Sequence, residues 1–312
     1  MKYEIQNILD NQKDSLEQLG TKEKFWFDNN KKLFKIGRPG TGEDWVEVVS
    51  AEICKMLDIP HAKYEFATYE NDQGTITTNF VPKDGRLIHG NEVLAKAYSN
   101  VHIEYQETMK YKLREYKLKV IKSILTLPTT LNDKPISPQM NMLKKDTEIK
   151  SAFDMFIGYI MLDCLISNQD RHHENWGIII IDKDIFLAPT FDHASGLGNK
   201  ETDAEKVDRL NSKDKGYQVK AFVRKAKTPF YHKSEKTLTT IEAFRLCSEW
   251  NSKAAKYWLD KLNKITEDNL YTIFKKVPNH IISEISIKFA IEIIKENKIR
   301  LLEIQEELQN EN

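Results

Sequence analysis

Four consecutive isoleucines, at positions 178–181, constrain the fold of this chain more than any other feature of its sequence. An unbroken run of β-branched residues favours a buried strand. A polar turn and a second apolar run follow, so we predict a short β-hairpin over 178–187. Apolar residues at intervals of three and four predict helices before the hairpin (149–167) and after it (238–309). The chain therefore places a hairpin inside a largely helical region.

The first eighty residues show a different order of elements. Aromatic and apolar residues flank a polar turn and predict a hairpin over 25–36. Glycine and proline predict a loop over 37–44, and helical spacing of apolar residues predicts a helix over 45–57. Two further strands are expected over 63–69 and 75–81. We therefore expect a small α+β unit at the beginning of the chain.

The rest of the chain is expected to form a second, larger unit. Helices are predicted over 92–107 and 108–125, and the lysine-rich residues 199–236 resemble a long surface segment. The change of pattern predicts an α+β protein with two lobes, a small α+β lobe over 1–82 and a mainly helical lobe over 83–312.

Charge and hydropathy exclude several classes of protein. The 47 basic and 47 acidic residues give a formal net charge of zero, which argues against a globally basic nucleic-acid binder. The longest apolar run, 153–166, is interrupted by two aspartates and is shorter than the about 20 residues that span a bilayer. The charged N-terminus does not resemble a signal peptide. We expect no DNA binding, no membrane span and a cytoplasmic location.

The three cysteines Cys54, Cys164 and Cys247 lie far apart and form no C-x-x-C pair. They indicate neither a disulfide framework nor a thiolate metal site, and we expect three reduced, mostly buried thiols.

The polar stretch 167–177 lies between the predicted helix and the hairpin, and loops held by rigid elements often carry functional groups. Asp170 and Asn175 in this stretch are five residues apart, which is the spacing of the Asp and Asn in the catalytic loop of protein kinases. There the Asp accepts the proton of the substrate hydroxyl and the Asn coordinates Mg²⁺. Asp192, just after the hairpin, supplies the further carboxylate that a hard cation prefers.

Phosphoryl transfer also needs cations on the phosphates of the nucleotide. Lys35 lies in a predicted strand, and a strand lysine paired with a helix glutamate is the kinase arrangement. Glu47 and Glu52 on the following helix are both candidates for that glutamate. The loop over 20–24, just before the first hairpin, is in the place of a loop that would cover the phosphates with backbone N–H groups.

The adjacent histidines His172 and His173 offer a different interpretation, a zinc site with Asp170 or Asp192. Neighbouring histidines on one backbone rarely point at one ion, and neither H-x-x-x-H nor H-x-x-E-H is present. We therefore expect His172 to brace the loop by hydrogen bonds, and we include it with Asp170 in the catalytic set.

Four motifs together resemble the HipA-like serine/threonine kinases. Residues 168–177 resemble the N-x-D-R-H-x-x-N-x-G catalytic loop of that family, and residues 187–192 resemble its L-A-P-x-[YF]-D metal segment. Residues 47–60 look like the family helix that starts with Glu and ends L-G-[LI]-P. Residues 20–24 are similar to the G-x-Q-E-K end of its phosphate loop.

The resemblance implies a bilobal protein-kinase-like fold with ATP and Mg²⁺ in the cleft. It implies that Asp170 is the catalytic base and that Asn175 and Asp192 are metal ligands. It favours Glu47 over Glu52 as the partner of Lys35, and it places residues 78–81 at the hinge, where the backbone and Phe80 would meet adenine. The expected nucleotide-binding residues are Gly20, Thr21, Lys24, Lys35, Glu47, Thr78 and Phe80.

The chain departs from the family near its start. Many members carry an additional N-terminal subdomain, so the resemblance implies a minimal member without it. Residues 17–20 replace the S-x-S-G start of the phosphate loop, and the regulatory serine of well-known members has no counterpart. The resemblance also leaves open that this is a bacterial protein exported as an effector.

The resemblance implies a serine/threonine protein kinase that uses ATP and Mg²⁺. A phosphoinositide or small-molecule kinase, and a pseudokinase that only binds, are the alternatives. Residues 217–236 carry six basic side chains against one acidic side chain, Glu235. The simpler interpretation is a solvated lysine-rich loop, and the functional interpretation is that this segment docks an acidic or phosphate-bearing protein acceptor.

Overall fold

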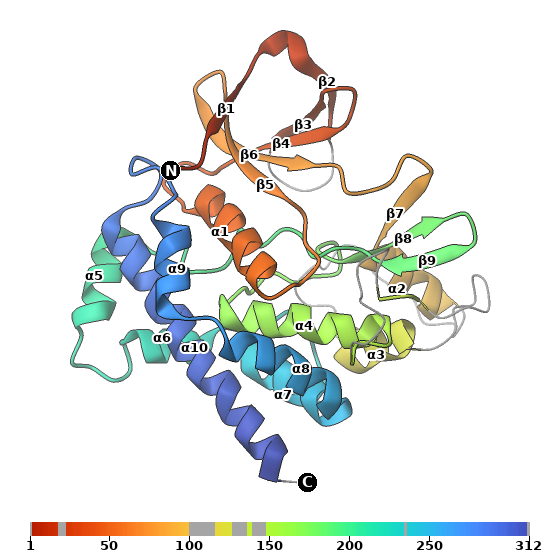
Figure 1. Cartoon of the computed structure of the whole chain (residues 1–312), viewed down its shortest axis with the longest axis vertical. Coiled ribbons are helices and arrows are strands. Elements are labelled where there is room, and N and C mark those ends of the chain that lie inside the picture. The colour runs from red at the N-terminus through yellow and green to blue at the C-terminus, as the bar shows by residue number, and fades with distance from the viewer. Residues whose placement is uncertain are drawn as a thin grey trace.

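The computed structural model describes residues 2–17, 23–99, 116–126, 136–138, 148–233 and 236–310. Figure 1 shows a β-sheet lobe above a larger helical lobe, with the second, smaller sheet to one side. The α+β, two-lobed architecture expected from the sequence is confirmed. Gly20 and Thr21 lie outside the described residues, as do residues 100–115 of the two helices expected over 92–125.

The small lobe is a six-stranded sheet in the order β1-β5-β6-β4-β3-β2, with one helix, α1, packed against β5 and β6. β1 pairs with β5 in parallel, and the other pairs are antiparallel. The elements are β1 (Ile5–Ile8), η1 (Asp10–Gln12), β2 (Lys13–Leu16), β3 (Lys24–Phe27), β4 (Lys32–Ile36), α1 (Glu43–Met56), β5 (Tyr64–Tyr69) and β6 (Asp72–Thr78).

Alternation along β3 and β4 explains how this sheet buries one face. Phe25 and Phe34 stand opposite each other in the register and are both fully buried, with ring centroids 5.3 Å apart. Lys24 and Lys35, one position away on each strand, are also opposite each other and therefore point to the other face. That face borders the cleft described below.

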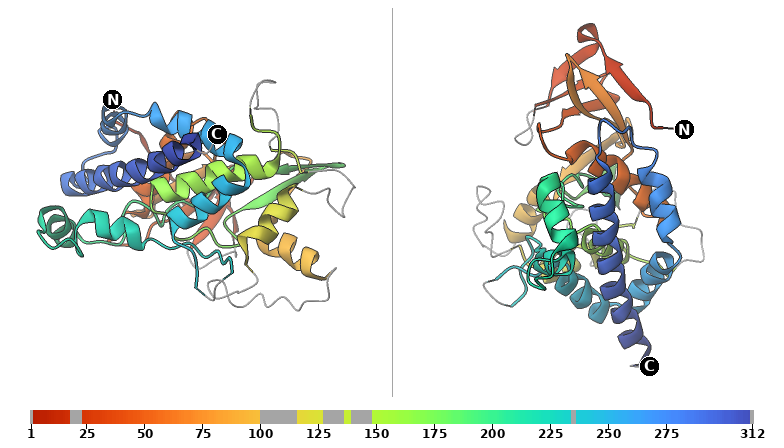
Figure 2. Two further views of the ribbon diagram at one scale, coloured as in Figure 1. Left: turned by 90° about the horizontal axis from the view of Figure 1, so that it is seen from below. Right: turned by 90° about the vertical axis from the view of Figure 1, so that its left-hand side faces the viewer.

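The large lobe is built around α4 (Ala152–Leu165), all of whose 14 residues are buried. Ser151 caps the helix by accepting a hydrogen bond from the Asp154 N–H, and the Asp154 side chain accepts one from the Ser151 N–H. Gly158 allows α8 to approach closely, because a Cβ there would lie 2.6 Å from the Trp258 indole. Figure 2 shows the long α10 running along this lobe.

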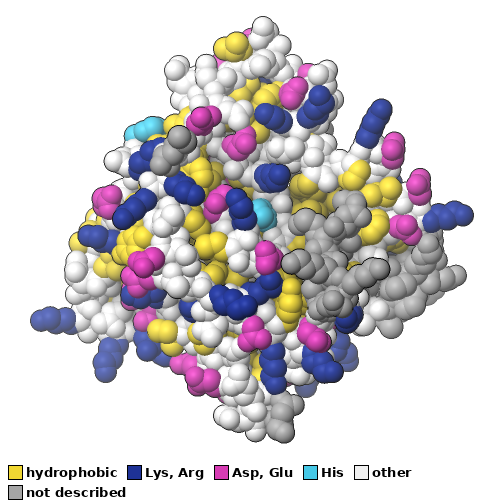
Figure 3. Space-filling model, viewed as in Figure 1, with side chains coloured by type: hydrophobic (Ala, Val, Ile, Leu, Met, Phe, Trp, Pro, Cys, Tyr) yellow, Lys and Arg dark blue, Asp and Glu magenta, His cyan; other side chains and the backbone are white. Residues whose placement is uncertain are grey.

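The other helices of this lobe are α2 (Gly90–Ser99), α3 (Leu118–Thr126), α5 (Asp203–Asn211), α6 (Val219–Lys225), α7 (Thr240–Trp250), α8 (Ser252–Asn263), α9 (Glu267–Phe274) and α10 (Glu284–Asn310). Together, α4, α7, α8 and α10 pack against one another and form the main core. None of the helices in the described part of the chain is long and apolar enough to cross a membrane. Acidic and basic side chains are interspersed over the face shown in Figure 3.

A three-stranded antiparallel sheet lies beside the cleft. β7 (Gly85–His89) pairs with β8 (Gly177–Ile181), and β8 pairs with β9 (Asp184–Leu187). The two predicted hairpins are thus confirmed, as β3–β4 and β8–β9. The segment that follows the small lobe thus contains β7, which pairs with the β8–β9 hairpin of the large lobe.

Two expectations about local structure were wrong. The strand expected over 75–81 ends at Thr78, so Phe80 lies beyond the sheet. Residues 199–236 do not form a simple surface segment, because they fold into α5 and α6. This segment also contributes fully buried side chains to the core, including Val223 and Phe230. The i, i+4 spacing of Val219 and Val223 predicts a helix with one buried face, but the lysine-rich composition of the segment made this pattern easy to overlook.

Candidate active site

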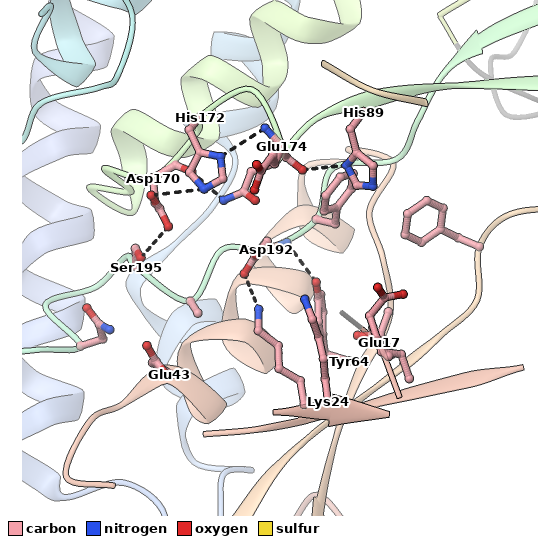
Figure 4. A pocket seen from close by; sticks show the side chains of 18 of the residues that line it. Glu17, Lys24, Glu43, Tyr64, His89, Asp170, His172, Glu174, Asp192 and Ser195 are labelled. Carbon is pink, nitrogen blue, oxygen red and sulfur yellow. Dashed lines mark hydrogen bonds and ion pairs between the residues drawn. The ribbon is translucent and has the colours of Figure 1, made fainter. Parts of the chain in front are cut away.

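A cleft with a volume of about 1000 Å³ is lined by both lobes. The sheet lobe contributes Lys24 and Lys35, and the helical lobe contributes Asp170, Asn175 and Asp192. Figure 4 shows the side chains of Lys24, Asp170 and Asp192 around this space. Of the other predicted residues, Thr78, Phe80 and His172 also line the cleft.

Lys35 on β4 is the centre of the charged groups. Its Nζ lies 2.6 Å from Asp192 Oδ1 and 3.6 Å from Glu47 Oε1, so Glu47 and not Glu52 is its neighbour on α1. The Glu47 side chain is 2% exposed. Burial lowers the pKa of Lys35, but the carboxylates of Asp192 and Glu47 outweigh this effect and leave the pKa raised. Lys35 is therefore protonated at neutral pH and links β4, α1 and the segment that carries Asp192.

The backbone around Asp192 holds this arrangement in place. Asp192 has a φ of +59°, which turns the chain back sharply after Phe191. The Asp192 N–H donates to the Tyr64 hydroxyl at 3.0 Å, and the next N–H, of His193, donates to Glu47 Oε2 at 2.8 Å. Glu47 thus contacts both the strand lysine and the segment that carries Asp192.

The loop over 167–177 is braced from below by a buried ion pair. The Arg171 guanidinium donates two hydrogen bonds to Asp163, at 2.8 and 2.7 Å, and both side chains are almost fully buried. The same guanidinium donates to the carbonyls of Asn175 at 2.8 Å and Phe191 at 3.3 Å. Asn168 donates to Asp163 at 2.8 Å. This one cation therefore ties the predicted catalytic loop to the segment before Asp192.

Sequence reasoning missed the role of Asp163. We noted it only as a charge that interrupts the apolar run of α4. A carboxylate in the middle of a mostly apolar helix needs a buried partner, and Arg171 follows eight residues later. That pairing was the available signal.

Hydrogen bonds hold Asp170 at the edge of the cleft. Its N–H donates to Asn168 Oδ1 at 3.2 Å, and its carbonyl accepts from the Asn175 amide at 2.7 Å. One carboxylate oxygen lies 3.8 Å from His172 Nε2, and the other accepts a hydrogen bond of 3.4 Å from the Ser195 hydroxyl. Asp170 and Asn175, predicted from their spacing, are therefore in direct contact.

The two histidines do not share a ligand-binding geometry. His172 Nδ1 accepts from the Glu174 N–H at 3.2 Å, which is the bracing contact expected from the sequence. The buried ring of His173 instead meets Tyr116 edge to face. Within the described residues, no group of three or more His, Cys, Asp or Glu side chains is placed to hold one metal ion. The described structure thus gives the zinc interpretation no support.

One end of the cleft is aromatic. Thr78 and Phe80, at the expected hinge, line it together with residues of β7. Phe80 stacks on Phe191 with ring centroids 5.7 Å apart and planes inclined by 26°. His89 meets Phe191 edge to face, and its Nδ1–H donates a hydrogen bond to the Glu174 carbonyl at 2.9 Å. A flat apolar group would find both stacking surfaces and backbone polar groups here.

Comparison with known proteins supports the fold. No protein-family model and no curated protein sequence matches the chain. Among solved structures, it is similar to the proinflammatory kinase CtkA of Helicobacter pylori, with 21% identity and a TM-score of 0.65, over 91% of this chain and 92% of that one. It is also similar to a structure of the HipA–HipB toxin–antitoxin system with operator DNA from Shewanella oneidensis MR-1. In that case identity is 10% and the TM-score 0.52, over 93% of this chain and 65% of that one.

These likenesses confirm that the chain has a kinase-like fold of the kind seen in HipA and CtkA, as the sequence motifs predicted.

Proposed function

We propose that this chain is an ATP- and Mg²⁺-dependent phosphotransferase that acts on serine or threonine hydroxyls of a protein. The observation that carries the proposal is the contact of Lys35 with both Glu47 and Asp192, in a cleft that also holds Asp170 and Asn175. Lys35 and Asp192 are 157 residues apart in sequence, yet the fold brings them within 2.6 Å. A strand lysine, a helix glutamate and a metal-binding aspartate in contact are the arrangement that kinases use.

The donor set in the cleft suits Mg²⁺. Asn175 and Asp192 offer amide and carboxylate oxygens, which this hard cation prefers together with phosphate oxygens. These two residues would hold the ion, which would supply charge stabilisation to the transferred phosphoryl group. Lys35 and its cross-strand neighbour Lys24 would place two ammonium groups over the phosphates.

Asp170 would serve as the general base. Its carboxylate accepts the proton of the acceptor hydroxyl while that oxygen bonds to the γ-phosphorus, and the bond from phosphorus to the bridging oxygen breaks to release ADP. The Asp163–Arg171 pair and Asn168 keep the loop in one conformation. Asp170 can therefore present its carboxylate without a reorganisation step.

The acceptor would approach along α6. Phe222 of this helix lines the cleft, and the Lys227 N–H donates to Gln169 Oε1, next to Asp170, at 3.3 Å. Arg224 and Lys225 are exposed. This basic segment contacts the residue before the predicted base, which supports an acidic or phosphate-bearing protein acceptor.

Transfer of labelled phosphate from ATP tests the proposal. The purified chain is incubated with [γ-³²P]ATP and Mg²⁺, with dephosphorylated casein as an acidic protein acceptor and, separately, with phosphatidylinositol vesicles. Label on serine or threonine of casein that is lost with EDTA supports the proposal. Label on the lipid alone would indicate the phosphoinositide alternative. ATP binding with no ADP release under any condition would indicate a pseudokinase.

A further inference from the structure

Ser195 faces the predicted base from the segment that carries Asp192. Its hydroxyl donates to Asp170 Oδ2 at 3.4 Å, whereas the other oxygen, Oδ1, lies 3.8 Å from His172 Nε2 (Figure 4). Ser195 lines the cleft and is half-buried. The carboxylate of Asp170 therefore has a polar neighbour on each of its two oxygens.

The backbone fixes Ser195 on both sides. Two residues before it, the buried His193 donates its N–H to Glu47 Oε2 at 2.8 Å. Two residues after it, the fully buried Leu197 donates its N–H to the Ile166 carbonyl at 2.7 Å. Ser195 therefore stands on a short tight segment that is anchored to α1 at one end and to the end of α4 at the other.

Asp170 is anchored independently of Ser195. The Asp170 N–H donates to Asn168, and the Asp170 carbonyl accepts from Asn175. The next residue, Arg171, is tied to α4 through its hydrogen bonds to Asp163. Two separately anchored segments thus bring the hydroxyl and the carboxylate together. The contact does not depend on a flexible side chain that reaches across solvent.

We propose that Ser195 is a positioning residue for Asp170, an inference that rests on the proposed phosphotransferase function. The Ser195 hydroxyl occupies one lone pair of Oδ2 and holds the carboxylate in one orientation. The second lone pair of the same oxygen stays available for the proton of the acceptor hydroxyl. Without Ser195 the carboxylate turns more freely about its last bond, and the fraction of time in the productive orientation falls.

Four variants test this role in the phosphate-transfer assay: Ser195→Ala, Ser195→Thr, Asp170→Asn and the double variant Ser195→Ala/Asp170→Asn. We expect Ser195→Ala to lower kcat about tenfold with the KM for ATP nearly unchanged, because loss of one orienting contact misplaces the base. Ser195→Thr keeps the hydroxyl and should recover most of kcat. In the Asp170→Asn background, Ser195→Ala should cause no further loss.

Ser212→Ala is the matched control, because Ser212 is also half-buried but lies at the end of α5, away from the cleft. It should leave kcat unchanged. An unaffected kcat in Ser195→Ala, or an equal loss in the Asp170→Asn background, would overturn the positioning role alone. A wild type without phosphate transfer would overturn the proposed function and this role together.

Peptide mass spectrometry of the wild type after incubation with Mg²⁺ and ATP tests whether Ser195 is itself phosphorylated. A phosphate located on Ser195 would show that this hydroxyl is itself an acceptor, and would overturn the positioning role. An unmodified Ser195 together with the kcat pattern above supports it.

Discussion

The two walls of the cleft are held in place by different interactions. The helical wall, residues 167–177, rests on the buried Asp163–Arg171 pair and on hydrogen bonds from Asn168. The sheet wall is formed by β3, β4 and β6. Next to β3 lies the edge strand β2, with three of its four residues exposed. The cleft-facing Lys35 of the sheet wall is held by charge, through Glu47 and Asp192.

This difference separates two kinds of residue. Groups on the helical wall owe their position to a desolvated network, so damage there should cost stability. Lys35 is held by the carboxylates of Glu47 and Asp192, in the place where the phosphates of ATP would bind. A substitution of Lys35 should therefore weaken ATP binding. The predictions below compare the two walls, beginning with the largest expected effect.

Asp163→Ala should destabilise the protein by about 3–5 kcal/mol, because it leaves the Arg171 guanidinium buried without its carboxylate. The free energy of unfolding is measured by urea denaturation. Asp58→Asn is the control, because Asn removes the charge and tolerates the φ of +54° at this position. Asp58 bonds Lys261 at 2.6 Å but is 76% exposed, and such surface pairs contribute about 0–1 kcal/mol. Equal losses in the two variants would show that the helical wall does not depend on its buried pair.

Lys35→Met should weaken Mg²⁺-ATP binding by about tenfold or more, since a hydrogen bond between charged groups is worth about 1.5–3 kcal/mol. Titration calorimetry measures the affinity. Lys32→Met is the matched control, because Lys32 lies on the same strand but does not line the cleft. If both variants bind ATP as the wild type does, Lys35 is a structural cation and the sheet wall does not hold phosphate.

Charge reversal at Arg224, Lys225 and Lys227 should have the smallest effect, a rise of severalfold in the KM for an acidic protein acceptor. The affinity for ATP should not change. These side chains are exposed, so salt should screen their contribution, with a Debye length of about 10 Å at 0.1 M. The KM of the wild type should rise with salt more than the KM of the variant. An identical salt dependence would place the acceptor elsewhere.

Local patterns predicted the elements that local interactions determine. The two hairpins and α1 follow from residue type and spacing within a few positions. β1 and β2 were missed because half of IQNI and three of the four residues of KDSL are polar. In addition, β1 is held by parallel pairing with β5, about sixty residues away.

The site shows the same division. Asp170 and Asn175 lie in one loop, so their spacing could be read from the sequence, and the structure places the two residues in contact. The sequence gives no indication that Ser195 contacts Asp170, because the two residues meet only when their separate segments pack together in the folded chain. Asp163 was visible as an unusual charge, and Arg171 follows it by eight residues, but only the structure shows that the two side chains are buried against each other.

The most direct test of the account is the rate of phosphate transfer by Asp170→Asn. This substitution keeps the size of the side chain but removes the proton acceptor, and general-base catalysis is worth about 10²–10⁴ in rate. We predict a loss of about 100-fold or more in kcat, with Mg²⁺-ATP affinity and the free energy of unfolding close to those of the wild type. Transfer at the wild-type rate by this variant would contradict the assignment of Asp170 as the base.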